Sequence, residues 1–304
     1  MEDKNAQVSG AVYGLLAATI WGAWPVLSRA AVGGALGPQE VAVLRFGVAG
    51  LVLLPYLLRR GLGHVGLAKA CVIAAGAGVP YVLIMMRGLE LAPAGHAGVI
   101  TPSVMLLVSS LGGALLLKDR ISVSRLIGLG VIVAGLVTLG SASFGALEGN
   151  QWQGDLLFAL GGLLWASYTV ACRAWSIEPF HATALVSVLS LVALVPLTLA
   201  SGTPGLLQAP FTEVVFQGVF QGLFAAILAL LFYSRSVALL GAGRGAVFAA
   251  LVPGLSVLLA YPVLGEVPSL HELAGLAVVS LGVSGALGLW PSRCSRLSSA
   301  RQRI

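Results

Sequence analysis

The amino-acid sequence predicts an all-α membrane protein in which ten transmembrane helices form two inverted five-helix repeats around a central cavity. Three observations lead to this prediction: an extreme apolar composition, apolar runs long enough to span a bilayer, and a repeat that relates the two halves of the chain. Of the 304 residues, 58% are hydrophobic and only 9% are charged. A soluble domain carries about a quarter charged residues, so this composition excludes a soluble fold.

Apolar runs of about 20 residues, bounded by glycine, proline and charged residues, predict the ten spans. They cover residues 9–31, 37–58, 65–89, 92–117, 121–142, 152–173, 180–201, 212–238, 240–264 and 269–290. A polar stretch from Ser143 to Gln153 separates the fifth span from the sixth. We therefore expect a first repeat over residues 1–145, a second, inverted repeat over 146–290, and a basic tail over 291–304.

The basic residues predict the orientation of the spans. With the amino terminus inside, fourteen of the seventeen Lys and Arg residues fall in inner connections or in the tail. The outer loops 142–152, 201–212 and 264–269 contain none. Because positively charged loops stay on the cytoplasmic side, both termini are predicted there. The tail arginines then face anionic lipid, which accounts for much of the net charge of +6 without nucleic acid as a partner.

The second half of the chain repeats features of the first. The motif at residues 21–29 returns at residues 165–173, 144 positions later. Residues 125–135 correspond in the same way to residues 272–282, with glycines at matching positions. Each half has five predicted spans, an odd number, so the second half must enter the membrane upside down. Inverted repeats are typical of secondary transporters, whose substrate site lies at the repeat interface near the midplane.

Three features occur in the order found in a known family. They are Arg45-Phe46 in the second span, an acidic residue before the last span of each half (Asp119 and Glu266), and the glycine pattern of that last span. Over about residues 9–290 the chain resembles the drug/metabolite transporter superfamily, EamA-type, and within it is most similar to the YddG-type exporters of amino acids. The resemblance implies a basket-like ten-helix fold, multi-pass in a bacterial-type inner membrane, and export of small molecules.

We therefore predict a transporter that exports amino acids, aromatic and other neutral ones included, and related small metabolites by alternating access. All eleven acidic residues lie at span ends or in loops. Because proton-coupled pumps for cationic drugs generally need a carboxylate at membrane depth, the sequence favours a facilitator, with histidine-based coupling left open. The alternatives are drug or toxic-cation efflux and sugar-phosphate or nucleotide-sugar exchange. Such exchange needs basic residues that face the cavity, and Arg45 is the only basic residue of the chain that is a candidate for this position.

Catalysis is not predicted. The four histidines stand singly at span ends, and the three cysteines show no paired spacing, so neither a metal site nor a disulfide framework is expected. No nucleophile and base converge in the sequence pattern. We predict no enzyme activity and no cofactor, with a small-molecule substrate and the lipid bilayer as partners, and we assign no oligomeric state.

Two aromatic pairs are the first candidates for the transport pathway. Trp21 and Trp24 stand three positions apart, as do Trp165 and Tyr168 in the second half, so each pair shares one helix face. Such rings offer an apolar wall, a hydrogen-bonding edge and a face for an ammonium group. Helix packing is the alternative interpretation.

A glycine-proline break is predicted in the third span. Pro80 follows two glycines, and broken helices at membrane depth are tolerated where they line a cavity. Tyr81 and Met85, one turn apart, are predicted to face that cavity. The alternative is a kink with a purely structural role.

Polar residues in the fourth and eighth spans are further candidates. His96, near the outer start of the fourth span, is predicted to bind a carboxylate or to relay a proton, with Thr101 deeper in the same span; a solvated histidine is the alternative. Gln217 and Gln221, one turn apart in the eighth span, are candidate ligands for amino-acid polar groups. A role as hydrogen-bonding ties between helices is favoured for both.

Among the residues of the predicted spans, Arg45 has the highest free-energy cost of insertion into the membrane. A lone arginine at membrane depth costs roughly 2.5–3.5 kcal/mol by insertion scales, so Arg45 must face protein, a backbone carbonyl or water. The family resemblance implies a structural or gating role for Arg45 rather than direct substrate contact, and we predict such a role also for three prolines of the apolar spans, Pro80, Pro102 and Pro253.

Overall fold

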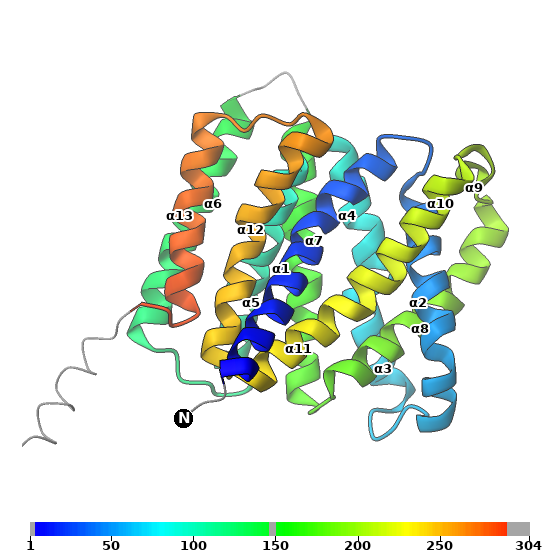
Figure 1. Cartoon of the computed structure of the whole chain (residues 1–304), viewed down its shortest axis with the longest axis horizontal. Helices are drawn as coiled ribbons and strands as arrows, with labels where there is room; N and C mark the ends of the chain where they lie inside the picture. The colour runs from blue at the N-terminus through cyan, green and yellow to red at the C-terminus, as the bar shows by residue number, and fades with distance from the viewer. Residues whose placement is uncertain (1–3, 146–149, 291–304) are drawn as a thin grey trace, which may run out of the picture.

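The computed structural model describes residues 4–145 and 150–290, which form helices and connecting turns with no strand in either range. The helices cross the molecule side by side, and α1 (Lys4–Val32) runs obliquely through the middle of the view in Figure 1. We call the end of the bundle at which α1 finishes the upper end, and the end at which it begins the lower end.

The helices follow the predicted spans closely. After α1, the first half contains α2 (Pro38–Arg60), α3 (Gly66–Ala77), α4 (Val79–Leu91), α5 (Ala94–Leu116) and α6 (Val123–Gly145). The second half contains α7 (Gln151–Ala174), α8 (Pro179–Ser201), α9 (Pro204–Gln208), α10 (Phe211–Gln217), the π-helix η1 (Gly218–Leu228), α11 (Ala229–Leu240), α12 (Ala242–Leu264) and α13 (Leu270–Ala286). Counting α3–α4 and α10–η1–α11 as single segments, nine helices in the described part of the chain are long and apolar enough to cross a membrane.

The last predicted span, 269–290, is shorter than expected. Helix α13 has 17 residues, or about 25 Å at 1.5 Å per residue, against a hydrocarbon thickness of about 30 Å. It ends because Gly288 adopts a left-handed conformation with φ of 77°. The chain then turns back, and the Trp290 indole donates to the Ser284 hydroxyl at 2.9 Å.

The third span is broken between α3 and α4, where a break was predicted. Gly78 has φ −95° and ψ −139°, outside the helical region. Pro80 occupies the first turn of α4, where its missing N–H costs no helical hydrogen bond. The break also allows close packing, because a Cβ on Gly78 would lie 2.2 Å from the Ser190 hydroxyl oxygen of α8.

The eighth span contains a long π-helical stretch that the sequence did not predict. Over Gly218–Leu228 the backbone bonds from i to i+5, a geometry that is rare and frequent at functional sites. Here the helix lies against α2, because a Cβ on Gly222 would lie 2.5 Å from Cβ of Val48.

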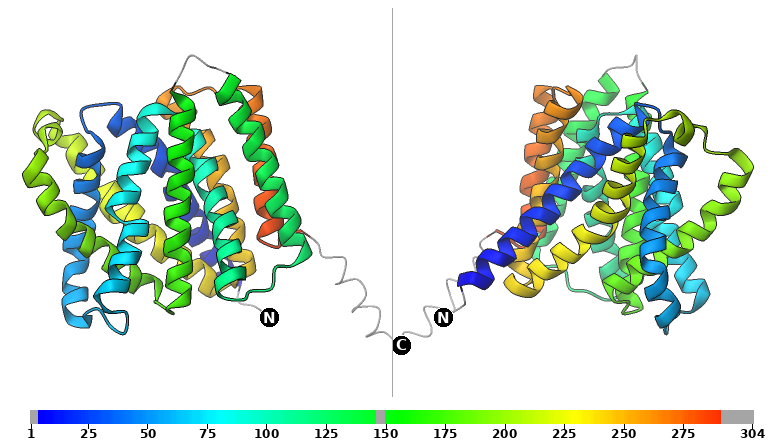
Figure 2. Two further views of the ribbon diagram at one scale, coloured as in Figure 1. Left: turned by 180° about the vertical axis from the view of Figure 1, so that it is seen from behind. Right: turned by 45° about the vertical axis from the view of Figure 1, so that its right-hand side comes forward.

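The two halves interlock rather than standing side by side. Helix α1 packs against α11 and α12 of the second half, and α7 packs against α3, α4 and α5 of the first. Helix α2 packs on α8, and α6 packs on α13 at one edge of the bundle (Figures 1 and 2). Each of these contacts between the halves therefore has a counterpart in which the halves exchange roles.

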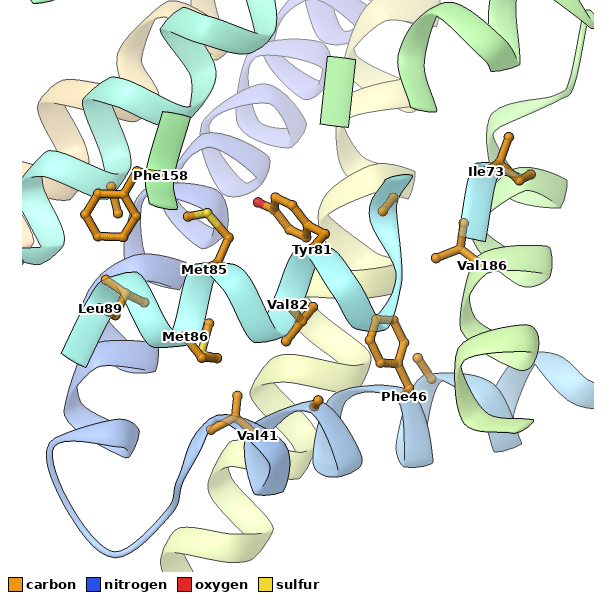
Figure 3. Close-up of a cluster of buried hydrophobic side chains, with 14 of the residues drawn as sticks. Val41, Phe46, Ile73, Tyr81, Val82, Met85, Met86, Leu89, Phe158 and Val186 are labelled. Atoms are coloured by element: carbon orange, nitrogen blue, oxygen red, sulfur yellow. The ribbon is translucent and has the colours of Figure 1, made fainter. Parts of the chain in front are cut away.

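Large apolar side chains cover the outside of the bundle, as a lipid-facing surface requires. Leu115, Leu199 and Leu258 are 79%, 82% and 71% exposed. Inside, α4 presents two different faces, because Tyr81 and Met85 point to one side of the helix while Val82 and Met86 point toward α2 (Figure 3).

Candidate functional site

A central cavity of about 230 Å³ lies between the two halves. Helices α1, α2, α4 and α5 of the first half and α7, η1 and α12 of the second contribute to its wall. Trp165 and Ala225, which line it, lie near the middle of their helical segments. The cavity is therefore at mid-depth of the bundle.

Eight of the residues selected from the sequence line this cavity. They are Trp21, Trp24, Tyr81, Met85, Thr101 and Trp165, together with Arg45 and Pro102 from the structural group. The lining residues missed by the sequence interpretation are mostly small or apolar: Pro25, Ala97, Gly98, Met105, Ala225, Ala249 and Val252. A residue without a polar or aromatic group carries no signal that separates a cavity wall from ordinary helix packing.

The aromatic rings form a connected wall across the two halves. Trp24 of α1 stacks on Tyr81 of α4, with centroids 6.0 Å apart and planes at 14°. Tyr81 meets Trp165 of α7 edge-on at 4.8 Å. Tyr168 does not line the cavity; its ring lies against Trp165 at 5.6 Å, so the second predicted pair places one ring in the wall and the other as its support.

Trp21, the first ring of the other pair, also has a partner in the opposite half. Its centroid lies 5.3 Å from that of Tyr233 on α11, with planes at 52°. Trp21 lines the cavity at the same time. Packing and cavity lining, which the sequence treated as alternatives, therefore both apply to this residue.

Gln221 is a buried hydrogen-bonding hub between η1 and α1. Its side-chain oxygen accepts from the Trp24 indole at 2.8 Å, and its amide donates to the Ser28 hydroxyl at 2.8 Å. Gln217 donates to the Leu27 carbonyl at 3.0 Å. Neither glutamine lines the cavity, and these bonds correspond to the predicted role as ties between helices.

Arg45 brings a positive charge to the cavity wall with few hydrogen-bond partners. The residue is 7% exposed, and its guanidinium carbon lies 5.6 Å from the Trp24 ring centroid. One long hydrogen bond runs from Nη1 to the Gln221 side-chain oxygen at 3.5 Å. Its Nε is buried without a hydrogen-bond partner in the described part of the chain, so at least one of the five guanidinium donors is unsatisfied in this lining residue.

Thr101 and the prolines support the wall. The Thr101 hydroxyl is placed to donate to the Phe158 carbonyl at 3.2 Å and lies 3.5 Å from the Met85 sulfur, linking α5 to α7 and α4. Pro102 follows it in the wall. Pro253 is buried within α12 beside lining residue Val252, while Pro80 is exposed at the start of α4.

His96 lies in a different cavity, which we call the upper cavity. It has a volume of about 180 Å³ and is lined by His96, Glu266 and Glu272 among apolar residues of α5, α6, α12 and α13. His96 is 3% exposed; Nδ1 lies 2.8 Å from an Asp155 oxygen and Nε2 lies 2.8 Å from a Glu272 oxygen. The solvated alternative is therefore wrong for this histidine.

Two ion pairs join the halves at opposite ends of the bundle. At the upper end, Nε of Arg29 lies 2.5 Å from Glu266, and the same guanidinium donates to the carbonyls of Leu89 and Ala92. At the lower end, Nη2 of Arg173 lies 2.7 Å from Asp119. Each carboxylate precedes the last helix of its half, α6 or α13, where a carboxylate can also stabilise the start of the helix.

At α13 the capping is instead done by two other residues. The Ser269 hydroxyl accepts from the Glu272 backbone N–H at 3.2 Å, and the Glu272 carboxylate accepts from the Ser269 N–H at 2.6 Å. This reciprocal arrangement is a capping box. Glu266 therefore does not cap α13, and its carboxylate forms the ion pair with Arg29.

Comparison with known proteins places these features in a family. The sequence profile of the EamA-like transporter family matches the chain twice, over residues 8–141 and 152–288. The chain is 26% identical over 291 residues to the uncharacterized inner membrane transporter YedA of Escherichia coli strain K12, covering 90% of this chain and 88% of the relative. It is 24% identical over 265 residues to the uncharacterized transporter YyaM of Bacillus subtilis strain 168, covering 84% and 86%.

The fold also has a counterpart among solved structures. A crystal structure matches with a TM-score of 0.59 at 22% identity, covering 93% of this chain and 98% of that one. At this identity the likeness concerns the fold alone. The two profile matches cover most of the residues, each spanning one half, and the chain therefore belongs to the EamA-like transporter family.

Proposed function

We propose that this protein exports amino acids, aromatic and other neutral ones, from the cytoplasm through the central cavity by alternating access. The observation that carries the proposal is the under-satisfied Arg45 guanidinium at a wall of aromatic rings. Arginine binds carboxylates through charge-assisted hydrogen bonds, and tryptophan faces attract ammonium groups. One wall thus offers complementary groups for both charges of a zwitterion and for an apolar side chain. The curated relatives' names give no substrate, so this specificity rests on the cavity.

The size and charge of the cavity favour a small solute over the alternatives. Its volume of about 230 Å³ is below the range of about 300–1,000 Å³ usual for drug-sized ligands. None of its described lining residues is acidic, although a cationic drug would call for a carboxylate. A sugar phosphate would call for several cations, and Arg45 is the one basic residue among the described lining residues.

We infer that the chain has ten spans in two inverted halves, with α13 as the tenth. Helix α13 packs along α6, its counterpart in the first half, and the family profile matches each half separately. The reciprocal packing of α1 and α7 on the opposite half supports the same arrangement. Alternating access then follows from rocking the halves about the cavity that they share.

We assign the lower end to the cytoplasm of a bacterial inner membrane. The α2–α3, α5–α6, α7–α8 and α11–α12 connections lie at the lower end, and α1 and α4 finish at the upper end (Figure 1). In or near the lower connections the chain carries Arg59, Arg60, Lys69, Lys118, Arg120, Arg125, Arg173, Arg235 and Arg244, whereas near the ends of α1 and α4 it carries Arg29 and Arg87. Positive residues stay on the cytoplasmic side. The inner-membrane assignment also agrees with the name of the Escherichia coli relative.

Purified protein in liposomes, assayed with three related solutes, tests the proposal. Phenylalanine has both charges, phenethylamine lacks the carboxylate and phenylpropionate lacks the ammonium group. We expect transport of phenylalanine alone. Arg45→Gln should reduce that transport about 10-fold or more, because a hydrogen bond to a charged group contributes about 1.5–3 kcal/mol.

The matched control is Arg120→Gln, which removes an exposed arginine from the α5–α6 connection. It should transport phenylalanine as the parent protein does. Transport of phenethylamine as fast as phenylalanine would show that the carboxylate is not recognised. Unchanged transport by Arg45→Gln would remove Arg45 from the substrate site.

A further inference from the structure

The upper cavity contains an arrangement that the transport pathway does not use. His96 of α5 lies between Asp155 of α7 and Glu272 of α13, at 2.8 Å from each carboxylate. The histidine belongs to the first half and both carboxylates to the second. The cluster therefore connects the halves at the upper end, beside the Arg29–Glu266 ion pair.

The geometry of this cluster determines how many protons it holds. A neutral imidazole has one N–H and one lone pair, and an ionised carboxylate only accepts hydrogen bonds. With both ring nitrogens at 2.8 Å from carboxylate oxygens, a neutral imidazole between two carboxylates would press a lone pair against an acceptor. The cluster thus holds one more proton, as an imidazolium or on a carboxyl group.

The described residues that line the upper cavity include no Lys or Arg. Glu266 also lines the upper cavity, but Arg29 pairs with it. Helices α6 and α12 contribute Leu139, Val257 and Ala260, which are apolar. Losing the proton would leave a carboxylate on each side of a buried neutral ring, one of them facing a ring nitrogen that has no hydrogen to donate.

The Glu272 carboxylate is held in a fixed position beside His96. While one carboxylate oxygen contacts His96, the other accepts from the Ser269 N–H at 2.6 Å in the capping box of α13. The position of the carboxylate is therefore tied to the start of α13. A change at His96 acts directly on that helix.

We propose that Asp155, His96 and Glu272 form a proton-binding site that controls the upper end of the transporter. With the proton bound, the cluster fastens α13 and α7 to α5; without it, repulsion loosens this end and opens the upper cavity. Val267, which lines the cavity, is 75% exposed, so protons reach the site from the upper side. Calling that side external rests on the proposed function, whereas the proton site itself does not.

Nitrogen NMR of ¹⁵N-histidine-labelled protein in nanodiscs measures the proton directly. The His96 signals are assigned by their loss in His96→Gln. We expect the parent protein to show a His96 imidazolium at about pH 8, above the value near 6.5 at which free imidazole titrates. Glu272→Gln, which keeps the capping box but removes the charge, should shift deprotonation of His96 to lower pH.

Cysteine labelling measures the opening of the upper cavity. In a background with Cys71, Cys172 and Cys294 replaced, Val99→Cys places a thiol in the upper cavity and Val267→Cys places one at its exposed edge. The ratio of their maleimide labelling rates cancels the intrinsic pH dependence of the thiol reaction. We expect this ratio to rise several-fold from about pH 6 to about pH 9, because the cluster keeps its proton up to about pH 8 and loses it as the pH rises further.

The same ratio should be high and independent of pH in His96→Gln. The proposal is overturned by a His96 imidazole that is already neutral at about pH 8, or by a labelling ratio whose pH dependence survives His96→Gln. Both measurements are independent of substrate. A protein that transports none of the tested amino acids would therefore contradict the proposed function while leaving the proton site supported by its own data.

Discussion

Trp165 meets a ring on either side and still lines the central cavity. Tyr81 contacts it at 4.8 Å and Tyr168 at 5.6 Å, so the indole is positioned by residues of two helices. Trp165→Ala should lower transport of phenylalanine in liposomes by about 2- to 30-fold, because a ring that binds an ammonium group contributes about 0.5–2 kcal/mol.

The control for this change is another tryptophan of the same helix. Trp152 is 40% exposed near the start of α7, and Trp152→Ala should leave transport unchanged. Both variants should be recovered from the membrane in parental amounts. Equal transport by Trp165→Ala and Trp152→Ala would mean that the Trp165 ring has only a packing role.

At the residue scale, the sequence was informative where chemistry and helical spacing coincide. Trp21, Trp24 and Tyr81 were selected because large amphipathic rings stand out on apolar helices, and all three line the cavity. The partners of His96 could not be found in this way. Asp155 and Glu272 lie 59 and 176 residues away from it in the chain, and only the packing of α5 with α7 and α13 brings them together.

At the scale of the elements, glycine residues allow the backbones of α6 and α13 to approach each other closely. A Cβ on Gly128 of α6 would lie 2.3 Å from the Ala286 backbone nitrogen, and one on Gly282 of α13 would lie 2.6 Å from the Ile132 nitrogen. Backbone atoms cannot move aside as a side chain can. Gly128→Ala should therefore separate the helices and lower the thermal stability of the purified protein, with an overpacking cost of about 1–3 kcal/mol.

Gly130, two positions along the same helix, provides the matched control. A Cβ there meets nothing within 4 Å, so Gly130→Ala should leave the unfolding temperature in detergent, measured by size-exclusion chromatography after heating, unchanged. A Gly128→Ala protein as stable as Gly130→Ala would show that the α6–α13 contact can spread without cost.

Breaks within elements were predictable only where a particular residue forces them. The Gly78–Pro80 break has such residues, and the sequence placed it correctly. The π-helical stretch Gly218–Leu228 has no comparable signal in the sequence. The end of α13 at Ala286 depends on Gly288 and on the bond from Trp290 to Ser284, both of which require the folded turn.

For the whole molecule, the two inter-half ion pairs are related by the internal repeat. Arg29 and Arg173 are equivalent positions of the repeated motif, and Glu266 and Asp119 are the acidic residues before the last helix of each half. Each pair thus joins an arginine of one half to a carboxylate of the other. The proposed alternating access requires one end to open while the other stays closed, so the two pairs should act in opposite directions.

This opposition can be measured with a cysteine in the central cavity. Ala249→Cys, in the cysteine-free background, places a thiol on the α12 side of the cavity wall. A membrane-impermeant maleimide added outside should label it faster in Glu266→Gln, because the upper end is released. It should label it more slowly in Asp119→Asn, because release of the lower end favours the state closed above.

Glu90→Gln separates these effects from a general loss of charge. It breaks the Arg87–Glu90 ion pair, in which Nη1 of Arg87 lies 2.5 Å from a Glu90 carboxylate oxygen. Both residues belong to α4 at the upper end, so this ion pair does not connect one half to the other. Its labelling rate should equal that of the parent protein, while exchanging the charges in Arg29→Glu with Glu266→Arg should restore the parental rate. If Glu266→Gln and Asp119→Asn instead changed labelling in the same direction, the pairs would hold a static bundle together and the halves would not rock about the cavity.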